Sequence, residues 1–408
     1  MKPSLQQMQP ALPAVAHFAQ YTAQVLSFVL EGAQDRLPPA EPNPDTPKWA
    51  ARLARAWSRE RRPHFLLLGL WQPCLAAELR RMLPEDVLLV VSDTSPDAVR
   101  AARQQAGAAV FSHPSAALLC DTSVWAQRLL LDAAGIEPAD TFVAINPLLP
   151  TERRPSYGEL ERLLALRLAD IPRPEGNTPP PSVSLAIILH PNEPGLADFF
   201  ASIPVWVEQV CVLWDACGLP AASSLGIAPD PRRIDVAHPL AGDFAAQRNR
   251  ALSLCRGDWV LSLDGDERLP ASLWAALPAL MSRQDVAGYY FQRQTLYPDP
   301  GSCKIGYGLW PDLQLRLFRN LPGVAYRRPV HEVLEGLPGT RAVLAAGAIE
   351  HYNRLNKTPE ELRRKLNVFD GAAGGAWEHR LNAEYPNLTR AWLPSSELEF
   401  PSRLLMLP

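Results

Sequence analysis

Three carboxylates follow a short apolar run near the middle of the chain. Residues 259–263 have the pattern of a buried strand, and Asp264, Asp266 and Glu267 come directly after it. Like charges in a partly dry site repel one another unless a cation neutralises them. Carboxylate oxygens suit Mg²⁺ or Mn²⁺, which also bind diphosphates. The pattern therefore predicts a divalent-cation site at the end of this strand, with a solvated acidic turn as the alternative.

Six sequence segments occur in a fixed order around these carboxylates. They are VSLAIILHPNE (183–193), DFAAQRN (243–249), GDWVLSLDGDERL (257–269), GLWPDLQLRLFRN (308–320), VHE (330–332) and IEHY (349–352). In this order they resemble family-2 glycosyltransferases of the GT-A fold, in a branch that includes bacterial transferases of the lipopolysaccharide core. The resemblance spans about residues 183–370 and leaves the first 180 residues without an assigned role.

The resemblance implies a nucleotide-sugar donor and assigns contacts to it. Glu193 would contact the nucleoside, and Asp215 would meet the base or the ribose. Arg248 and Asn249 would brace the diphosphate or orient Asp264, which would reach the ribose and the metal. The family usually has a basic residue before Asn-Glu on its first strand and a Gly-Ser-Thr-Asp run after its second strand. This chain has other residues at both places, so the sequence does not identify the nucleotide or the sugar of the donor.

The resemblance also implies the ligands of the divalent metal, Mg²⁺ or Mn²⁺. Asp266 would bind the metal between the two phosphates, together with Asp264. His351, at the end of the apolar run 342–349, is the candidate for a third ligand. A structural histidine, hydrogen-bonded within its own domain, is the alternative for His351.

A transfer with inversion needs one carboxylate to remove the proton of the acceptor hydroxyl. Glu332 in the VHE segment and Asp312 in the WPD segment are the two candidates. Glu332 is preferred because it would end a strand-like segment, 324–330, where a rigid element fixes its position. An ion pair with a neighbouring arginine is the alternative. One of Arg316 and Arg319 would face the diphosphate, and no covalent enzyme intermediate is expected.

The elements that must position these residues follow the pattern of α/β domains. Apolar runs separated by helical patterns predict parallel strands, and in the N-terminal half these runs are 64–70, 87–92, 108–112 and 141–146. The first run is not followed by G-x-G-x-x-G, so no dinucleotide site is expected there. The sequence predicts an α/β fold, with a GT-A-type nucleotide-sugar-binding domain preceded by a smaller Rossmann-like domain.

Composition shifts along the chain predict the domain boundaries. A segment with five prolines in twelve residues favours an extended spacer. The expected parts are a helical lead-in (1–62), a Rossmann-like α/β domain (63–170), a Pro-rich linker (171–182), the GT-A domain (183–355) and a C-terminal helical segment (356–408).

Composition and charge exclude several classes of protein. With 408 residues, 47% of them apolar, the chain can bury a large core. A formal charge of −3 gives no general attraction to nucleic acid, and none is expected as a partner. Six cysteines without a C-x-x-C pair indicate reduced thiols rather than a disulfide scaffold or a zinc site.

No secretory signal or membrane span is expected from the sequence, which predicts a cytoplasmic protein. A basic helical pattern at 358–369 is the candidate for peripheral contact with the inner face of a membrane, where a lipid-linked acceptor would lie. Packing of that helix on its own domain is the alternative.

The acceptor stays open between a glycan, a glycolipid and a protein side chain. Two other functions compete with glycosyl transfer. A nucleotidyltransferase also pairs an α/β fold with acidic metal ligands, but it would need a Gly-rich basic loop that residues 190–193 do not supply. A non-catalytic nucleotide-sugar-binding or docking protein is the other alternative, because the usual donor loop is changed.

Overall fold

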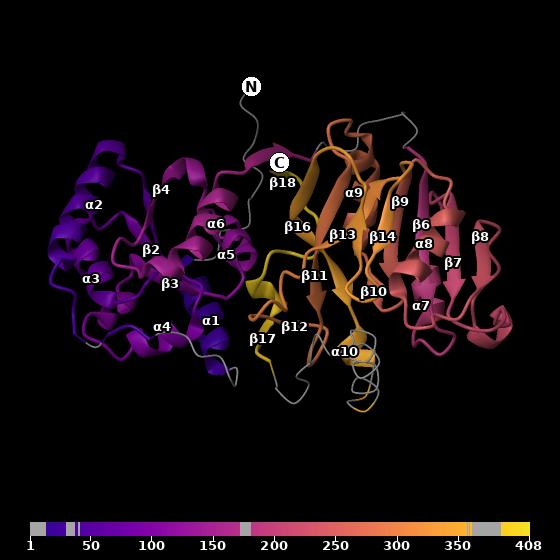
Figure 1. Ribbon diagram of the computed structural model, residues 1–408, viewed down its shortest axis with the longest axis horizontal. Coiled ribbons are helices and arrows are strands. Elements are labelled where there is room, and N and C mark those ends of the chain that lie inside the picture. Colours follow the sequence, from indigo (N-terminus) through magenta and orange to yellow (C-terminus); the bar gives the residue numbers. More distant parts are fainter. Residues whose placement is uncertain are drawn as a thin grey trace, which may run out of the picture. The chain divides into compact units, whose positions relative to one another are not determined.

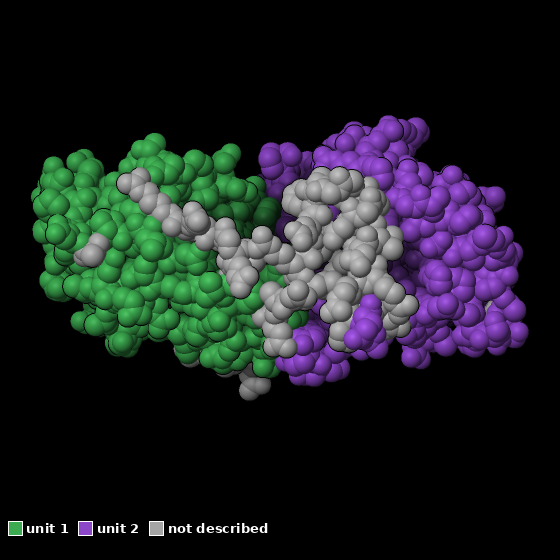
Figure 2. Space-filling view, turned by 60° about the horizontal axis from the view of Figure 1, so that its bottom comes forward, with its two compact units in different colours: residues 1–166, 304–311, 385–394 green, residues 167–303, 312–384, 395–408 purple. Residues whose placement is uncertain are grey.

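The computed structural model describes residues 14–29, 37–39, 41–171, 181–356, 358, 360 and 385–408. The chain divides into two compact units, which Figure 1 shows as ribbons and Figure 2 as surfaces. Unit 1 comprises residues 1–166, 304–311 and 385–394, and unit 2 comprises residues 167–303, 312–384 and 395–408. Both units combine helices with parallel strands, so the predicted α/β class is confirmed.

Unit 1 is built on a four-stranded parallel sheet in the order β3-β2-β1-β4. The strands are β1 (His64–Leu68), β2 (Leu88–Asp93), β3 (Ala116–Cys120) and β4 (Thr141–Ile145). The helices are α1 (Ala14–Ser27), α2 (Thr46–Glu60), α3 (Pro73–Met82), α4 (Pro96–Ala102), α5 (Val124–Ala133) and α6 (Arg154–Leu164). The 3-10 helices are η1 (Ala108–Ser112), η2 (Pro138–Asp140), η3 (Thr151–Arg153) and η5 (Arg390–Trp392).

One of the expected strands of unit 1 is wrong. The apolar run 108–112 forms the 3-10 helix η1, and the strand between α4 and α5 is instead β3 at 116–120. Every residue of β3 is buried, whereas no residue of η1 is. A short run that is mostly apolar does not by itself distinguish a strand from a short helix. Residues 116–120 form the strand because their side chains are buried on both faces of the sheet.

The helical lead-in belongs to unit 1, because α1 packs along the edge strand β3. The hydroxyl of Tyr21 donates to Asp121 Oδ2 at 2.5 Å, just beyond β3. The hydroxyl of Thr22 donates to the carbonyl of Leu118 and accepts from the amide of Cys120. Burial raises the pKa of Asp121 to about 7. These contacts satisfy backbone groups at the sheet edge that would otherwise lack partners.

Unit 2 is built on a ten-stranded mixed sheet in the order β5-β18-β16-β11-β13-β9-β6-β7-β8, with β10 paired to β16. Its strands are β5 (Arg167–Asp170), β6 (Val183–Leu189), β7 (Gln209–Trp214), β8 (Arg233–Ala237), β9 (Trp259–Asp264), β10 (Glu267–Arg268), β11 (Gly288–Thr295), β13 (Gln314–Arg319), β16 (Arg341–His351) and β18 (Arg403–Leu407). Its helices are α7 (Leu196–Ala201), α8 (Phe244–Leu254), α9 (Ala271–Ser282) and α10 (Asn353–Asn356), with the 3-10 helix η4 (Ala222–Leu225). Smaller strands of unit 2 are β14 (Ala325–Arg327) and β15 (Val333–Glu335). Strand β17 (Asn387–Thr389) belongs to unit 1, and β12 (Ser302–Lys304) spans the boundary between the units along the chain.

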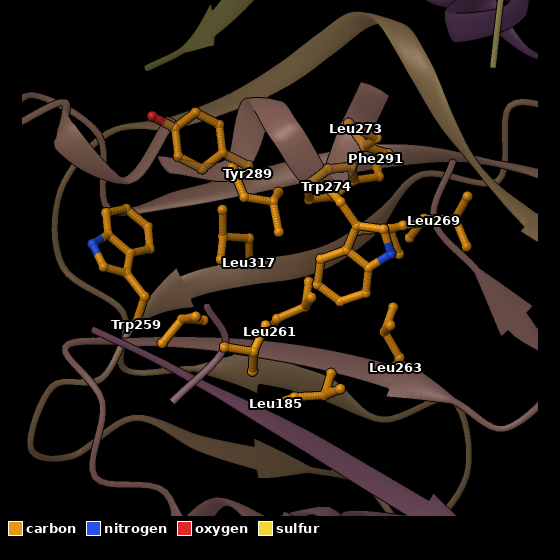
Figure 3. Packing of buried hydrophobic residues seen from close by; sticks show 14 of the residues in the cluster. Leu185, Trp259, Leu261, Leu263, Leu269, Leu273, Trp274, Tyr289, Phe291 and Leu317 are labelled. Atoms are coloured by element: carbon orange, nitrogen blue, oxygen red, sulfur yellow. The ribbon is translucent and has the colours of Figure 1, made fainter. Parts of the chain in front are cut away.

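The core of unit 2 lies against the central strands of this sheet. Trp259 and Leu261 of β9 pack in one apolar cluster with Leu185 of β6 and Leu317 of β13 (Figure 3). Strands β9, β6, β7 and β8 run parallel to one another. Near-continuous apolar runs are typical of parallel strands covered on both faces. This buried part of the sheet therefore provides rigid strand ends.

The C-terminal part departs from the expected helical segment. In residues 385–408 the chain forms β17 and β18, and β18 lies between β5 and β16. Because β5 pairs with β18, unit 2 begins at residue 167 rather than after the Pro-rich linker. Residues 172–180 of that linker, and the expected helix at 358–369 apart from residues 358 and 360, lie outside the described residues.

None of the helices in the described residues combines the length and the apolar character that a membrane span requires.

Candidate functional site

Acidic side chains lie at the carboxyl ends of three neighbouring parallel strands of unit 2. Asp264 ends β9, Glu193 follows β6, and Asp215 follows β7. The amide of Asp215 donates to the carbonyl of Leu189 at the end of β6. A Cβ placed on Gly265 would lie 3.2 Å from Cγ of Glu193, so the loops after β6 and β9 touch. The structure therefore brings these predicted residues to one edge of the sheet.

Helix α8 brings Arg248 to the same edge. Its first turn is capped by Asp243, whose side chain accepts from the amide of Ala246 at 2.8 Å. The guanidinium of Arg248 is buried and donates to Asp264 at 2.7 Å and to Glu332 at 2.5 Å. Arg248 therefore orients Asp264, which is one of its two expected tasks, and ties it to Glu332.

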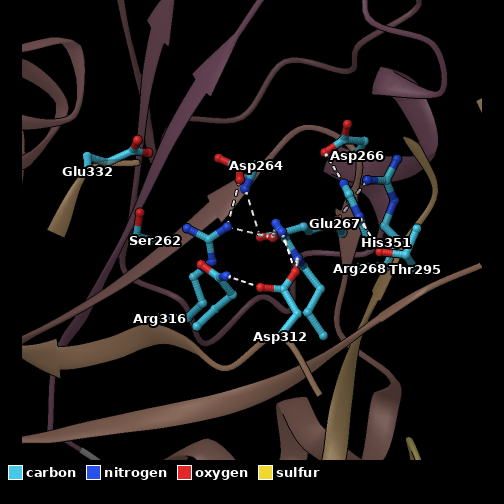
Figure 4. A network of polar contacts seen from close by, with 12 residues as sticks. Ser262, Asp264, Asp266, Glu267, Arg268, Thr295, Asp312, Arg316, Glu332 and His351 are labelled. Carbon is cyan, nitrogen blue, oxygen red and sulfur yellow. Dashed lines mark hydrogen bonds and ion pairs between the residues drawn. The ribbon is translucent and has the colours of Figure 1, made fainter. Parts of the chain in front are cut away.

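A second arginine holds the other oxygen of Asp264. Arg316, on β13, donates to Asp264 Oδ2 at 2.6 Å and to Glu267 Oε1 at 2.5 Å (Figure 4). Glu267 is completely buried and also receives a bond from Arg293 of β11 at 3.1 Å. Arg293 in turn donates to Asp312 at 2.5 and 2.8 Å. Alternating guanidinium and carboxylate groups thus form one continuous network.

At Asp264, arginine side chains supply the positive charge that the sequence led us to expect from a metal ion. Burial alone would raise the pKa of Asp264, but Arg248 and Arg316 outweigh it and hold that pKa well below its ordinary value. Each oxygen of the carboxylate accepts a bond from a different guanidinium. Both oxygens of Asp264 are therefore engaged by arginine, and its role as a metal ligand stays a prediction.

Asp266 and His351 form a separate pair beside this network. The register of β10 and β16 sets Glu267 opposite His351, which brings His351 Nε2 to 3.5 Å from Asp266 Oδ1. The other ring nitrogen, Nδ1, hydrogen-bonds with the hydroxyl of Thr295 at 3.0 Å. Such a second contact fixes the orientation of a metal-binding imidazole. Carboxylate and imidazole in this arrangement fit two ligands of a divalent cation.

Among the described residues, no three His, Cys, Asp or Glu side chains converge on one cation position. Of the three predicted ligands, Asp266 and His351 contact each other, whereas Asp264 is bonded to Arg248 and Arg316. Mg²⁺ commonly takes only one or two carboxylates from the protein and completes its shell with water and substrate phosphates. A two-residue site of this kind is compatible with that chemistry.

The two candidate bases differ in how their carboxylates are engaged. Both oxygens of Asp312 accept bonds, from Arg293 and from the side chain of Gln314. Glu332 accepts from Arg248 through Oε1, and the described residues provide no hydrogen bond to its second oxygen. The Glu332 side chain is 16% exposed. The geometry therefore favours Glu332 as a base, while Asp312 positions Arg293.

The local setting of Glu332 corrects two expectations. The expected strand over 324–330 is shorter, and Glu332 directly precedes β15 instead of ending that strand. Its ion-pair partner is Arg248 rather than an arginine beside it in the sequence. The carboxylate is thus held by a contact with α8, 84 residues away along the chain.

Other expected residues have structural partners. The amide group of Asn249 donates to the carbonyl of Tyr326 and accepts from its N–H, so Asn249 holds β14 against α8 rather than orienting Asp264. Asp215 accepts from the amide of Leu240 at 2.7 Å. Arg319 donates to the backbone carbonyls of residues 283 and 286 and does not face the site.

Arg293 is absent from the site expected from the sequence. It lies in β11 between Gln292 and Gln294, both of which are completely buried. Three successive polar residues inside an otherwise apolar strand are costly unless they find partners. That pattern in the sequence could have indicated a buried polar network, and so could Arg316 between two leucine residues of β13.

The sequence and the structure were compared with those of known proteins, and the similarities are partial. No protein-family model matches the sequence. A TPR repeat-containing protein of Synechococcus elongatus is 33% identical over 153 residues, which cover 38% of this chain and 35% of that protein. The chain thus spans about a third of the length of this curated relative.

Two crystal structures of S. aureus TarS residues 1–349, one in complex with UDP-GlcNAc, are also similar to this chain. They have TM-scores of 0.31 and 0.29 and are 13% and 11% identical. Each alignment covers 49% of this chain, with 69% and 68% of the respective TarS chain. TM-scores at this level establish neither a shared fold nor a shared activity.

Proposed function

We propose that this chain is a glycosyltransferase of the family-2 type, with a GT-A arrangement in unit 2. It would move a sugar from a nucleoside diphosphate sugar to an acceptor hydroxyl. The convergence of Glu193, Asp215 and Asp264 at three parallel strand ends carries the proposal. Ligands of α/β sheets bind in the crevice outside such ends, where a carboxylate accepts bonds from ribose hydroxyls. The order of the six sequence segments supports the same activity.

Asp264 would bind the donor as an ionised acceptor. Arg248 and Arg316 hold its pKa well below the ordinary value, so the carboxylate stays charged at neutral pH. Each carboxylate oxygen has about two acceptor positions, and each uses one for a guanidinium. The side chain is 28% exposed. The remaining positions are thus suited to hydroxyl donors such as a ribose.

Asp266 and His351 would hold a Mg²⁺ or Mn²⁺ ion. Such an ion, when bound, neutralises the negative charge that develops on a leaving diphosphate. The chain's own contribution is to present one carboxylate oxygen and one imidazole nitrogen 3.5 Å apart. The contact between His351 and Thr295 keeps the imidazole in that orientation. Replacement of either ligand should weaken metal-dependent donor binding.

Glu332 would act as the general base. Its Oε1 is held by Arg248, and its second oxygen would take the proton of the acceptor hydroxyl. A positioned base of this kind contributes about 10²–10⁴-fold in rate. Because the hydroxyl attacks the face opposite the leaving group, the configuration at the anomeric carbon would be inverted. The likeness of RLFRN and VHE to the lipopolysaccharide-core branch supports a bacterial surface glycan as acceptor.

Thermal unfolding of the full chain with nucleoside diphosphates and nucleotide sugars, with and without Mn²⁺, tests the proposal. A ligand at 100 times its Kd adds about 2.7 kcal/mol of stability. We expect a Mn²⁺-dependent shift with one nucleotide, and its loss in Asp266→Asn. The matched control is Glu208→Gln, which removes an exposed carboxylate just before β7, at the opposite edge of the sheet.

Three outcomes would contradict the proposal. Absence of a shift with every nucleotide would favour a non-catalytic docking protein. Release of pyrophosphate from a nucleoside triphosphate and a sugar phosphate would identify a nucleotidyltransferase. An equal loss of the shift in Asp266→Asn and Glu208→Gln would mean that the assay reports general charge rather than the site.

A further inference from the structure

One face of α2 in unit 1 carries a row of basic side chains. Lys48, Arg52, Arg55 and Arg59 are all exposed. At 100° per residue they fall within an arc of about 60° and extend along about 16 Å of the helix. Trp57 and the other buried residues of α2 lie on the opposite side, toward the unit 1 core. The basic stripe therefore lies on the side of α2 that faces away from the unit 1 core; the position of α2 in unit 1 is shown in Figure 1.

The stripe is unfavourable for the isolated chain. Like charges three or four residues apart destabilise a helix by about 0.2–0.5 kcal/mol per pair. Here each basic residue has such a neighbour. In the described part of the chain, no carboxylate forms an ion pair with the arginines at 52, 55 and 59, while Lys48 pairs only with the exposed Asp45 at 3.7 Å. An external anionic partner would relieve this repulsion.

The surroundings of the stripe favour a lipid surface over a nucleic acid. Single-stranded nucleic acid is bound by aromatic side chains that stack on its bases. The two tryptophans of α2 are not available for stacking: Trp57 is buried, and the guanidinium of Arg52 lies over the ring of Trp49 at 4.5 Å. The neighbouring helix α3 presents an exposed Met82, an apolar side chain, beside the exposed Arg81.

We propose that the basic stripe on α2 binds the anionic headgroups of a phospholipid bilayer. A row of basic side chains along one helix face matches a negatively charged membrane surface. Binding is electrostatic, reversible and dependent on salt. It places unit 1 on the membrane and gives a role to a part of the chain that the sequence resemblance leaves unexplained. The inference stands on unit 1 alone and does not depend on glycosyl transfer.

Sedimentation of the full chain with phosphatidylglycerol vesicles, compared with phosphatidylcholine vesicles, tests the inference. We expect binding to the anionic vesicles only, weakening as salt is added. Each basic side chain near such a surface contributes about fivefold to affinity. Replacement of Arg52, Arg55 and Arg59 by glutamine should therefore weaken vesicle binding on the order of a hundredfold. The melting temperature should not fall, because these side chains are exposed and their mutual repulsion is removed.

The matched control removes the same number of charges elsewhere. Glutamine at Arg103, Arg162 and Arg167, which are exposed and scattered, should leave vesicle binding unchanged. Equal weakening in the two triple variants would overturn the inference, because only net charge would then matter. So would absence of wild-type binding to anionic vesicles. Binding of single-stranded RNA or soluble polyphosphate that exceeds vesicle binding, and that is lost in the α2 variant, would reassign the stripe to a soluble polyanion.

Discussion

Removal of Arg316 should destabilise unit 2 through the carboxylates that it leaves behind. Arg316 is 5% exposed and bonds to Asp264 at 2.6 Å and to Glu267 at 2.5 Å. Arg316→Met keeps most of the side-chain volume but deletes the charge. Asp264 then retains Arg248 as its partner, and Glu267 retains Arg293. The variant therefore tests whether the network depends on charge balance rather than on packing.

The expected loss of unfolding free energy follows from this geometry. Deleting one partner of a buried ion pair typically costs 3–5 kcal/mol. Since each stranded carboxylate keeps one guanidinium, we expect about 3 kcal/mol, the lower end of that range. For a unit of this size, this corresponds to a fall in melting temperature of roughly 6–12 °C. Adding Glu267→Gln should recover about 1–2 kcal/mol, because contacting residues couple by such amounts.

The pH dependence of the unfolding free energy distinguishes a loss of charge balance from a simple loss of packing contacts. In the wild type, the depressed pKa of Asp264 contributes stability that is present above the unfolded pKa of about 3.9 and lost as pH falls below it. The stability gap between wild type and Arg316→Met should thus be constant from about pH 8 to pH 5 and narrow below about pH 4.

Arg319→Met is the matched control for this prediction. Arg319 lies on the same strand but donates only to backbone carbonyls, so its loss leaves no carboxylate stranded. The difference in unfolding free energy between wild type and Arg319→Met should not become smaller at acid pH. Adding Glu267→Gln to Arg319→Met should not restore stability. Melting of the full chain across this pH range makes the measurement. A cost below about 1 kcal/mol for Arg316→Met, or a gap independent of pH, would refute the reasoning.

Three further predictions follow from single side chains. Glu332→Gln should lower kcat for transfer by about 10²–10⁴-fold and leave the nucleotide-induced thermal shift intact; loss of the shift would place Glu332 at the donor instead. His351→Ala should raise the Mn²⁺ concentration that half-saturates the shift by about 10–100-fold, and an unchanged value would remove His351 from the metal site. The pKa of Asp121 is raised to about 7, so wild-type stability should fall as pH rises from about 4 to 7. Asp121→Asn, which still accepts from Tyr21, should reduce that fall, and an unaltered pH profile would contradict it.

Local sequence pattern was sufficient for the elements that carry the acidic residues. Helix α8 (244–254) and strand β6 (183–189) coincide with a helical pattern and a continuous apolar run in the sequence. The strand expected at 259–263 extends by one residue to Asp264. These segments are continuous apolar or helical patterns with clear ends, and such patterns depend mostly on neighbouring residues. The same local reasoning therefore placed Asp264 at the end of a buried strand.

Local pattern was not sufficient where distant segments decide the outcome. Residues 403–407 are a strand because they pair with β16 and β5, and nothing near them in the sequence distinguishes that pairing. Residues 108–112 are mostly apolar but form a 3-10 helix, and the more deeply buried residues 116–120 form the strand β3 instead. In both cases the secondary structure is selected by tertiary burial and pairing rather than by propensity.

The sequence by itself determined which residues are acidic, where the buried strands end, and hence that carboxylates gather at one edge of a parallel sheet. Only the tertiary structure decided how their charge is balanced. Arg293 and Arg316 reach the acidic strand end from β11 and β13, and Arg248 reaches it from α8. A buried charge takes the partner that lies within a few ångströms, whatever the separation along the chain. That distance is a property of the fold.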